Sequence, residues 1–227
     1  DPTNDVCGFD AARKHAILSS IGFRANVTFD DVLVEGIEKI DKSDIQYAKD
    51  MGYTIKLLTV ALRQENGIAL NVYPAFLPDN HPLSSVKGAY NAIYVTGNIV
   101  DDVMFYGRGA GALPTASAVM GDVISTAQHI LNGPTGTGMI MTDTKRIPFY
   151  SSLKLQNSYY FRLDVDDVTG VLSQIAAAFA ENDISICEVV QKRKTKGLAE
   201  LVLITELASR ESRLQVEKAL QVLPCRR

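Results

Sequence analysis

The sequence has few cysteines, no long apolar run and no basic patch, and each of these absences excludes a class of protein. Its three cysteines, Cys7, Cys187 and Cys225, have the spacing neither of metal ligands nor of a disulfide framework. We therefore expect reduced thiols, a cytoplasmic protein and no metal site. No apolar run approaches the roughly 20 residues of a membrane helix, and the N-terminal residues do not form a signal peptide.

The charged residues are of both signs and are mostly scattered. There are 23 Lys and Arg against 26 Asp and Glu, for a formal net charge of -3. The one basic run, within residues 192–196, is too short for a phosphate-backbone footprint, so we expect no nucleic-acid partner. A hydrophobic content of 46% in 227 residues is typical of a soluble globular protein with one large or two small domains.

The first fourteen residues, DPTNDVCGFDAARK, contain two acids and an amine on a short stretch of chain. The composition from Phe9 onward predicts a helix to about Ser20, with Gly22 as its C-cap. Asp10 and Lys14 are four residues apart and share a face of this helix. Taken alone, such a pair is an ordinary exposed ion pair worth about 0.3–0.5 kcal/mol.

Hydrophobic periodicity then predicts an α+β layer, with a mainly antiparallel sheet and helices on one face. The expected elements are a loop over 27–34, a helix from a capping box at Ser43 and Gln46 to Met51, a hairpin of strands 53–63 and 68–76, and a second hairpin of strands 89–95 and 99–106 turning at 96–98. Lys56 and Lys87 are better explained as a strand lysine and an exposed lysine than as catalytic groups.

A glycine-rich segment, YGRGAG over 106–111, follows the last of these strands and precedes a helix from Pro114 toward His129. Glycines at such a junction allow a ligand to approach the backbone closely, although a structural turn is the commoner explanation. Residues 132–158 are rich in Gly, Thr, Pro and Ser and are predicted to be a linker. From Tyr159 the order βαββα indicates most of a ferredoxin-like βαββαβ module, with its last strand absent or cut short.

These motifs together resemble homoserine dehydrogenase. The string DPTNDVCGFDAARK is similar to the substrate-site signature of that family, and EGIEKI, LPDNHPLSSVKGAYNAIYVTG and YGRGAGALPTASAV follow in the family's order. Residues 159–227 resemble an ACT regulatory domain. The resemblance implies a catalytic and substrate domain over 1–131, whose 109–131 segment returns toward a nucleotide-binding domain, then the linker and the ACT domain. It also implies that the chain is the C-terminal part of a longer enzyme and would not catalyse alone.

The resemblance assigns roles to individual residues. Lys14 would be the acid/base, Asp10 would hold the substrate or the lysine, and Asp5 would contribute to the same polar site. Gly111, with Gly109 beside it, would contact an NAD or NADP cofactor near the nicotinamide. The reaction would interconvert L-homoserine and L-aspartate 4-semialdehyde. A nearby carboxylate alone raises the pKa of a lysine. Burial, which lowers the pKa, must offset this rise if the lysine is to act as an acid/base near neutral pH.

An alternative function is that of an amino-acid-sensing and assembly module. ACT domains commonly bind an effector at the turn between the first strand and helix, which here contains Asp167, Thr169 and Gly170, with Asn182 at the far end of the helix. Threonine is the effector we expect, and a turn without a ligand is about as plausible. An incomplete sheet edge predicts at least a dimer. Another ACT-bearing enzyme is a third possibility, against which the N-terminal signature argues.

Overall fold

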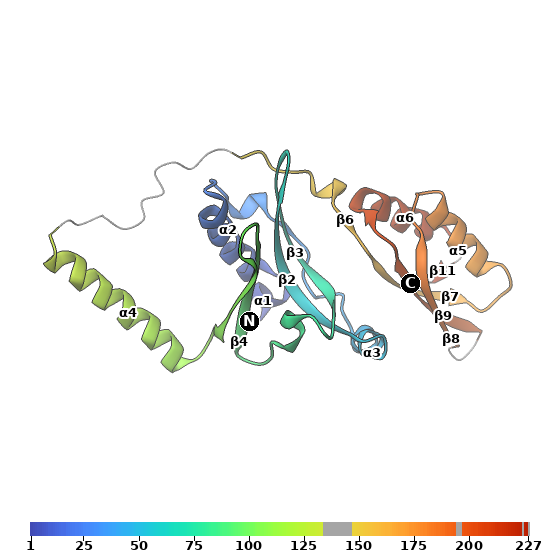
Figure 1. Ribbon diagram of the computed structural model, residues 1–227. Helices are drawn as coiled ribbons and strands as arrows, with labels where there is room; N and C mark the ends of the chain where they lie inside the picture. The colour runs from blue at the N-terminus through green and yellow to red at the C-terminus, as the bar shows by residue number, and fades with distance from the viewer. Residues whose placement is uncertain (134–146, 194–196, 224, 227) are drawn as a thin grey trace. The chain divides into compact units, whose positions relative to one another are not determined.

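The computed structural model describes residues 1–133, 147–193, 197–223 and 225–226 (Figure 1). It confirms the α+β fold class, with antiparallel sheets and a ferredoxin-like C-terminal module. Two compact units are present. The first comprises Asp1–Thr59 and Val72–Arg146, and the second comprises Val60–Asn71 and Ile147–Arg227. The hairpin of β2 (Tyr53–Gln64) and β3 (Gly67–Pro78) therefore contributes residues to both units.

The first unit begins with two helices joined at a tight corner. It contains α1 (Thr3–Val6), α2 (Phe9–Phe23), the 3-10 helix η1 (Phe29–Asp31), β1 (Leu33–Val34), α3 (Lys42–Asp50) and the 3-10 helix η2 (Pro82–Ser85). The prediction of Gly22 as the C-cap of α2 was wrong. The helix continues to Phe23 and closes at Arg24, which takes a left-handed conformation with φ 51°. The amides of Arg24 and Ala25 then cap the carbonyls of Ile21 and Ser20.

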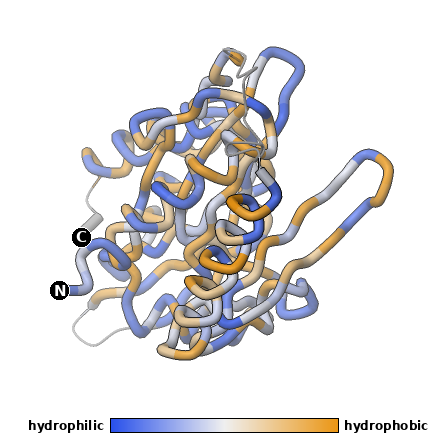
Figure 2. Tube along the Cα trace, turned by 90° about the vertical axis from the view of Figure 1, so that its left-hand side faces the viewer, coloured by the Kyte–Doolittle hydropathy of each residue, from blue (hydrophilic) through white to orange (hydrophobic). Residues whose placement is uncertain are grey.

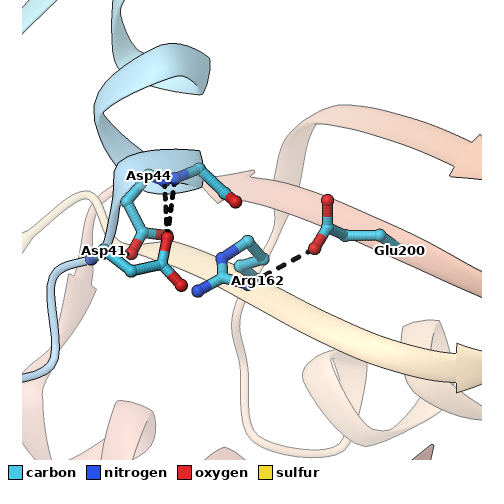
Figure 3. Close-up of polar contacts among 5 residues, drawn as sticks. Asp41, Asp44, Arg162 and Glu200 are labelled. Atoms are coloured by element: carbon cyan, nitrogen blue, oxygen red, sulfur yellow. Dashed lines mark hydrogen bonds and ion pairs between the residues drawn. The ribbon is translucent and has the colours of Figure 1, made fainter.

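The N-cap of α3 also differs from the prediction of Ser43. Asp41 is the cap, because its carboxylate accepts hydrogen bonds from the backbone amides of Ser43 at 2.7 Å and Asp44 at 3.2 Å (Figure 3). The Asp44 carboxylate accepts in return from the Asp41 amide at 2.9 Å, which completes a capping box two residues earlier than expected. The helix ends as predicted, with Met51 as its C-cap.

The two predicted hairpins are present but belong to separate sheets. The first forms a three-stranded sheet of order β1-β3-β2, and β4 (Tyr90–Gly97) and β5 (Asp101–Arg108) form a two-stranded sheet of their own. The β4–β5 register runs from Tyr90 opposite Arg108 to Gly97 opposite Asp101, so the turn lies at 98–100 rather than at 96–98. Helix α4 (Ala112–Leu131) follows and has no buried residue.

The second unit contains the βαββαβ module, whose last strand has two residues within the described part of the chain. Its sheet has the order β11-β7-β9-β8, with α5 and α6 as its helices. Its elements are β7 (Tyr160–Asp166), α5 (Val171–Ala180), β8 (Ile186–Arg193), β9 (Leu198–Thr205), α6 (Arg210–Val222) and the two-residue β11 (Cys225–Arg226). The core includes Ile175, Phe179, Leu203 and Val216, all fully buried. Arg162 on β7 pairs with the buried Glu200 on β9 at 3.3 Å (Figure 3).

Part of the predicted linker packs in this second unit. Residues 134–146 lie outside the described residues, but Phe149 forms a parallel bridge with Ile68 at the tip of the β2–β3 hairpin. A 3-10 helix, η3 (Ser152–Lys154), and strand β6 (Gln156–Asn157) follow, and β6 pairs with β10 (Ala208–Ser209). The tip of the hairpin and residues 147–158 are thus structurally part of the unit that holds the C-terminal module.

None of the helices in the described ranges combines the length and apolarity needed to cross a bilayer, and Figure 2 shows apolar residues interspersed with hydrophilic ones along the chain. Among the same residues, no three His, Cys, Asp or Glu side chains come together as metal ligands would.

Candidate functional site

The N-terminal signature places Asp10 and Lys14 on adjacent turns of α2. Their side chains form an ion pair with a Nζ–Oδ2 distance of 2.7 Å, as the i, i+4 spacing predicts. The lysine side chain is 66% exposed and the aspartate 44% exposed. This exposure leaves both groups accessible to a ligand, and it means that the pair contributes little to stability.

Asp5 lies on the other side of the α1–α2 corner. Its backbone carbonyl accepts from the Gly8 amide at 3.2 Å, and its side chain is exposed, with no ion pair to any residue that the structure describes. Gly8 makes the corner, with φ 77°. A Cβ there would lie 3.1 Å from Val72 and 3.3 Å from Val34, so both the conformation and the space favour glycine. Asp5 is therefore held by backbone contacts and has a carboxylate free for a ligand.

Arg13 belongs to the same signature and was not predicted to have a role. Its guanidinium donates to the Asn4 side chain at 3.1 Å and lies 5.6 Å from the centre of the Phe29 ring. It therefore ties α1 to α2 from the side chain, as Gly8 does from the backbone. An open cleft of about 400 Å³ lies beside it and is lined by α2 and by residues 27–29, without Asp5, Asp10 or Lys14.

The EGIE loop, defined here as residues 35–38, packs against the corner from the other side. The Ile37 amide donates to the Val6 carbonyl at 2.8 Å, and the Glu35 amide donates to the Val72 carbonyl of β3 at 2.8 Å. The Cys7 thiol donates to the Glu38 carboxylate. This hydrogen bond is the main reason that the pKa of Cys7 is raised and the pKa of Glu38 is lowered.

Lys56 has a lowered pKa. It lies on β2, and its ammonium donates to the Val86 carbonyl. Burial lowers its pKa, and the charge of Lys87 lowers it further. The single backbone partner agrees with the interpretation of Lys56 as a lysine held at a strand.

The glycine-rich segment forms the junction between β5 and α4. The Gly109 amide donates to the Ala89 carbonyl at 3.0 Å, and a Cβ on Gly109 would lie 2.6 Å from Cγ of Asn91. Gly111 caps α4 with φ 128°, a conformation that side chains rarely adopt. The backbone conformation at Gly111 favours glycine, whereas a side chain on Gly109 would require the Asn91 side chain to move. The apolar side chains of α4 are exposed, and they include Leu113, Val119, Met120, Val123, Ile124, Ile130 and Leu131.

In the second unit, the turn between β7 and α5 brings three of the four predicted effector residues together. The Asp167 amide donates to the Gly197 carbonyl at 2.8 Å, and Gly170 caps α5 with φ 95°. Thr169 lies between them. Asn182 is not at this turn. It follows the ten-residue α5, at the opposite end, and its side-chain amide donates to the Ala178 carbonyl at 2.8 Å.

Comparison with known proteins assigns both halves of the chain. A family described as homoserine dehydrogenase matches residues 1–124, more than half of the chain. The chain belongs to the homoserine dehydrogenase family. The ACT domain family matches residues 159–225, which correspond to the βαββαβ module. The N-terminal match contains the signature, the EGIE loop and the first part of α4.

Relatives and solved structures agree with this assignment. The chain is 40% identical to homoserine dehydrogenase of Bacillus subtilis over 212 residues, which are 92% of this chain and 48% of that protein. It is 38% identical to homoserine dehydrogenase of Helicobacter pylori over 98% of this chain and 52% of that one. The structure of a homoserine dehydrogenase from Thiobacillus denitrificans superposes with a TM-score of 0.90 at 33% identity, covering 100% of this chain and 53% of that chain. The chain thus spans about half the length of these relatives.

The structure pairs Asp10 with Lys14 and leaves Asp5 exposed across the corner. The contacts of Arg13 with Asn4 and of Glu38 with Cys7 were not predicted, because each contact joins separate segments of the chain. For Arg13 and the EGIE loop, the only available signal was their position inside motifs that resemble the family.

Proposed function

We propose that this chain supplies the substrate-binding and acid/base part of an NAD(P)-dependent homoserine dehydrogenase, which interconverts L-homoserine and L-aspartate 4-semialdehyde. The observation that carries the proposal is the exposed Asp10–Lys14 ion pair at 2.7 Å, inside the signature of a chain that belongs to this family. An amine held by a carboxylate can exchange a proton with the hydroxyl of an alcohol substrate once bound ligands bury the site, because burial offsets the effect of the carboxylate on an amine.

In the reduction, the Lys14 ammonium donates a proton to the oxygen of the forming alcohol and becomes a neutral amine. In the oxidation, that neutral amine takes the hydroxyl proton of homoserine. The Lys14 ammonium is positioned by Asp10, which keeps the side chain on one face of α2. The Asp5 carboxylate, which has no ion pair among the described residues, holds the substrate's ammonium group. A bound nicotinamide cofactor supplies the acceptor for the hydride that leaves the alcohol carbon.

The β5–α4 junction is the part of this chain that fits such a cofactor. Gly111 opens α4, whose first amides have no partner within the helix and favour an anion or a polar ligand. Gly109 has no side chain, so it leaves the backbone next to this helix start uncovered. The choice between NAD and NADP depends on residues that bind the ribose, which in dinucleotide-binding domains lie near the glycine-rich turn of the first strand and helix.

Turnover tests the proposal. The full-length protein that carries this sequence should reduce nicotinamide cofactor when L-homoserine is added and should release aspartate 4-semialdehyde in equal amount. L-serine, which is one carbon shorter, serves as the control substrate and should react far more slowly. Homoserine-independent reduction, or equal rates with both alcohols, would contradict the assignment.

The ACT domain favours a second function, which is feedback regulation by an amino acid. We infer that threonine, or a similar small amino acid, binds at the β7–α5 turn. There the left-handed Gly170 exposes the amides at the start of α5 to a carboxylate, and Asp167 provides a charge for an ammonium group. The enzyme would then act in the cytoplasm, at the branch point of threonine, methionine and isoleucine synthesis, as at least a dimer. Coupling of about 1–3 kcal/mol is usual, so partial inhibition is expected.

A further inference from the structure

Gly36, in the EGIE loop, packs directly against Val6 and Cys7 of the signature. A Cβ on Gly36 would lie 2.7 Å from Cα of Cys7, and it would overlap the Val6 carbonyl oxygen and the Glu38 carboxylate still more. Its φ is not among the positive values of the chain, so the requirement at this position is for space and not for an unusual backbone conformation. Two of the three clashing atoms belong to the backbone, which cannot move aside as the end of a side chain can.

The contacts on either side of Gly36 hold the loop at both ends. The Glu35 amide is bonded to the Val72 carbonyl of β3, and the Ile37 amide is bonded to the Val6 carbonyl, each at 2.8 Å. The Cys7 thiol adds a side-chain bond to Glu38. The loop therefore connects a sheet strand to the two residues that directly follow Asp5 and precede the Gly8 corner.

We propose that Gly36 is a positioning residue for the substrate site, because its missing side chain lets the EGIE loop close on Val6 and Cys7 and so fixes Asp5 relative to α2. This inference rests on the proposed function, since it assigns the substrate's ammonium group to Asp5. Asp5 has no ion pair of its own among the described residues, so its place depends on the backbone that the loop holds. Displacement by about 1 Å is enough to lower turnover by up to about a hundredfold.

The test is a kinetic and chemical comparison of Gly36→Ala with Gly22→Ala in the full-length enzyme. Gly22 is matched because it also lies in the first unit, and a Cβ there meets nothing within 4 Å. Gly36→Ala should lower kcat/KM for homoserine by about 10–100-fold and leave the KM for the nicotinamide cofactor within about twofold. Gly22→Ala should leave both unchanged. Unchanged homoserine kinetics in Gly36→Ala overturn the positioning role alone, whereas no homoserine turnover by the wild type overturns the proposed function.

Alkylation of Cys7, followed by peptide mass spectrometry, reports the loop without reference to activity. Glu38→Gln removes the carboxylate that raises the Cys7 pKa and should therefore speed alkylation, because the thiolate is the reactive form. If the loop leaves the corner in Gly36→Ala, Cys7 should react at the Glu38→Gln rate. A wild-type rate in that variant would contradict the proposal.

Should Gly36→Ala fail to fold, hydrogen exchange on the wild-type enzyme decides the question. Homoserine binding should slow exchange of the Glu35 and Ile37 amides, because the loop and the signature then act as one unit. Slower exchange over residues 5–14 with no change at 35–38 would overturn the proposal.

Discussion

Replacement of Lys14 by alanine should abolish most of the catalytic rate and leave the fold intact. Because the ion pair with Asp10 is largely exposed, its loss costs about 0.3–0.5 kcal/mol, or at most about 2 °C in Tm for a protein of this size. Loss of a general acid/base lowers kcat by about 10²–10⁴, which corresponds to about 2.7–5.4 kcal/mol in the activation barrier. The catalytic effect should therefore be several times the effect on stability.

The assay measures kcat from the nicotinamide absorbance and Tm by calorimetry, in the full-length enzyme. Lys49→Ala is a suitable control, because Lys49 is an exposed lysine on the neighbouring helix α3. The control should keep wild-type kcat. The reasoning would be refuted if Lys14→Ala retained kcat within about threefold of the wild type, which is too small a change for a general acid/base. It would also be refuted if a loss of activity came with a loss of folding.

Four further predictions follow from the cap, the hairpin tip, the turn and the sheet edge. Asp41→Ala should lower the free energy of unfolding, measured by urea denaturation, by about 1 kcal/mol, because Asp41 is the N-cap of α3. Ser43→Ala should lower it much less, and a larger loss in Ser43→Ala than in Asp41→Ala would refute this. Gly67→Ala should lower the free energy of unfolding by about 1–3 kcal/mol, because Gly67 has φ 144° and a Cβ would overlap the Pro148 carbonyl. Gly121→Ala is the control, since a Cβ at Gly121 meets nothing within 4 Å, and equal melting temperatures of the two variants would refute the clash. Calorimetry with threonine, methionine, isoleucine and serine should detect binding of threonine. Gly170→Val should abolish this binding, because valine is strained at φ 95°. If none of the four amino acids binds at millimolar concentration, the ACT domain is left as an assembly device. Sedimentation at micromolar concentration should show at least a dimer, because β8 is an unpaired sheet edge in the described chain with Val189 exposed; a monomer would count against this.

The elements that the sequence predicted most closely are those with a complete hydrophobic period. Strand β9 and helix α6 are the last two elements of the order βαββα that the sequence predicts from Tyr159, and both are present. In both, apolar residues repeat along the whole element, and the buried Leu201, Leu203, Val216 and Leu220 are members of that repeat. Tertiary packing and local pattern therefore favour the same residues.

The two caps were mispredicted because more than one residue could end each helix. Gly22 is a common stop, but the carbonyls of Ser20 and Ile21 find partners beyond it in Ala25 and Arg24, which stabilises another turn. Ser43 is a good N-cap, but Asp41 gains a reciprocal bond with Asp44 that Ser43 lacks. Choosing between such residues requires the backbone path, which the sequence alone does not provide.

In the candidate site, the sequence predicted the contact within one helix but not the contacts between distant segments. The i, i+4 spacing predicted the Asp10–Lys14 pair because both residues lie on one helix. The contact of Gly36 with Val6 and Cys7 spans about thirty residues, and the side-chain contact of Gly109 with Asn91 joins two segments. Such contacts depend on how loops and strands meet, so glycine in either position appears in the sequence only as a general turn signal.

The central claim is that Asp5, Asp10 and Lys14 meet at the substrate. A crystal structure of the full-length enzyme with homoserine and an oxidised nicotinamide cofactor bound would test it most directly. We predict Lys14 Nζ within about 2.6–3.2 Å of the homoserine hydroxyl, the range for direct proton transfer, with the Asp5 carboxylate on the substrate's ammonium group. A homoserine molecule bound elsewhere, with Lys14 still paired only to Asp10 in solvent, would contradict the account.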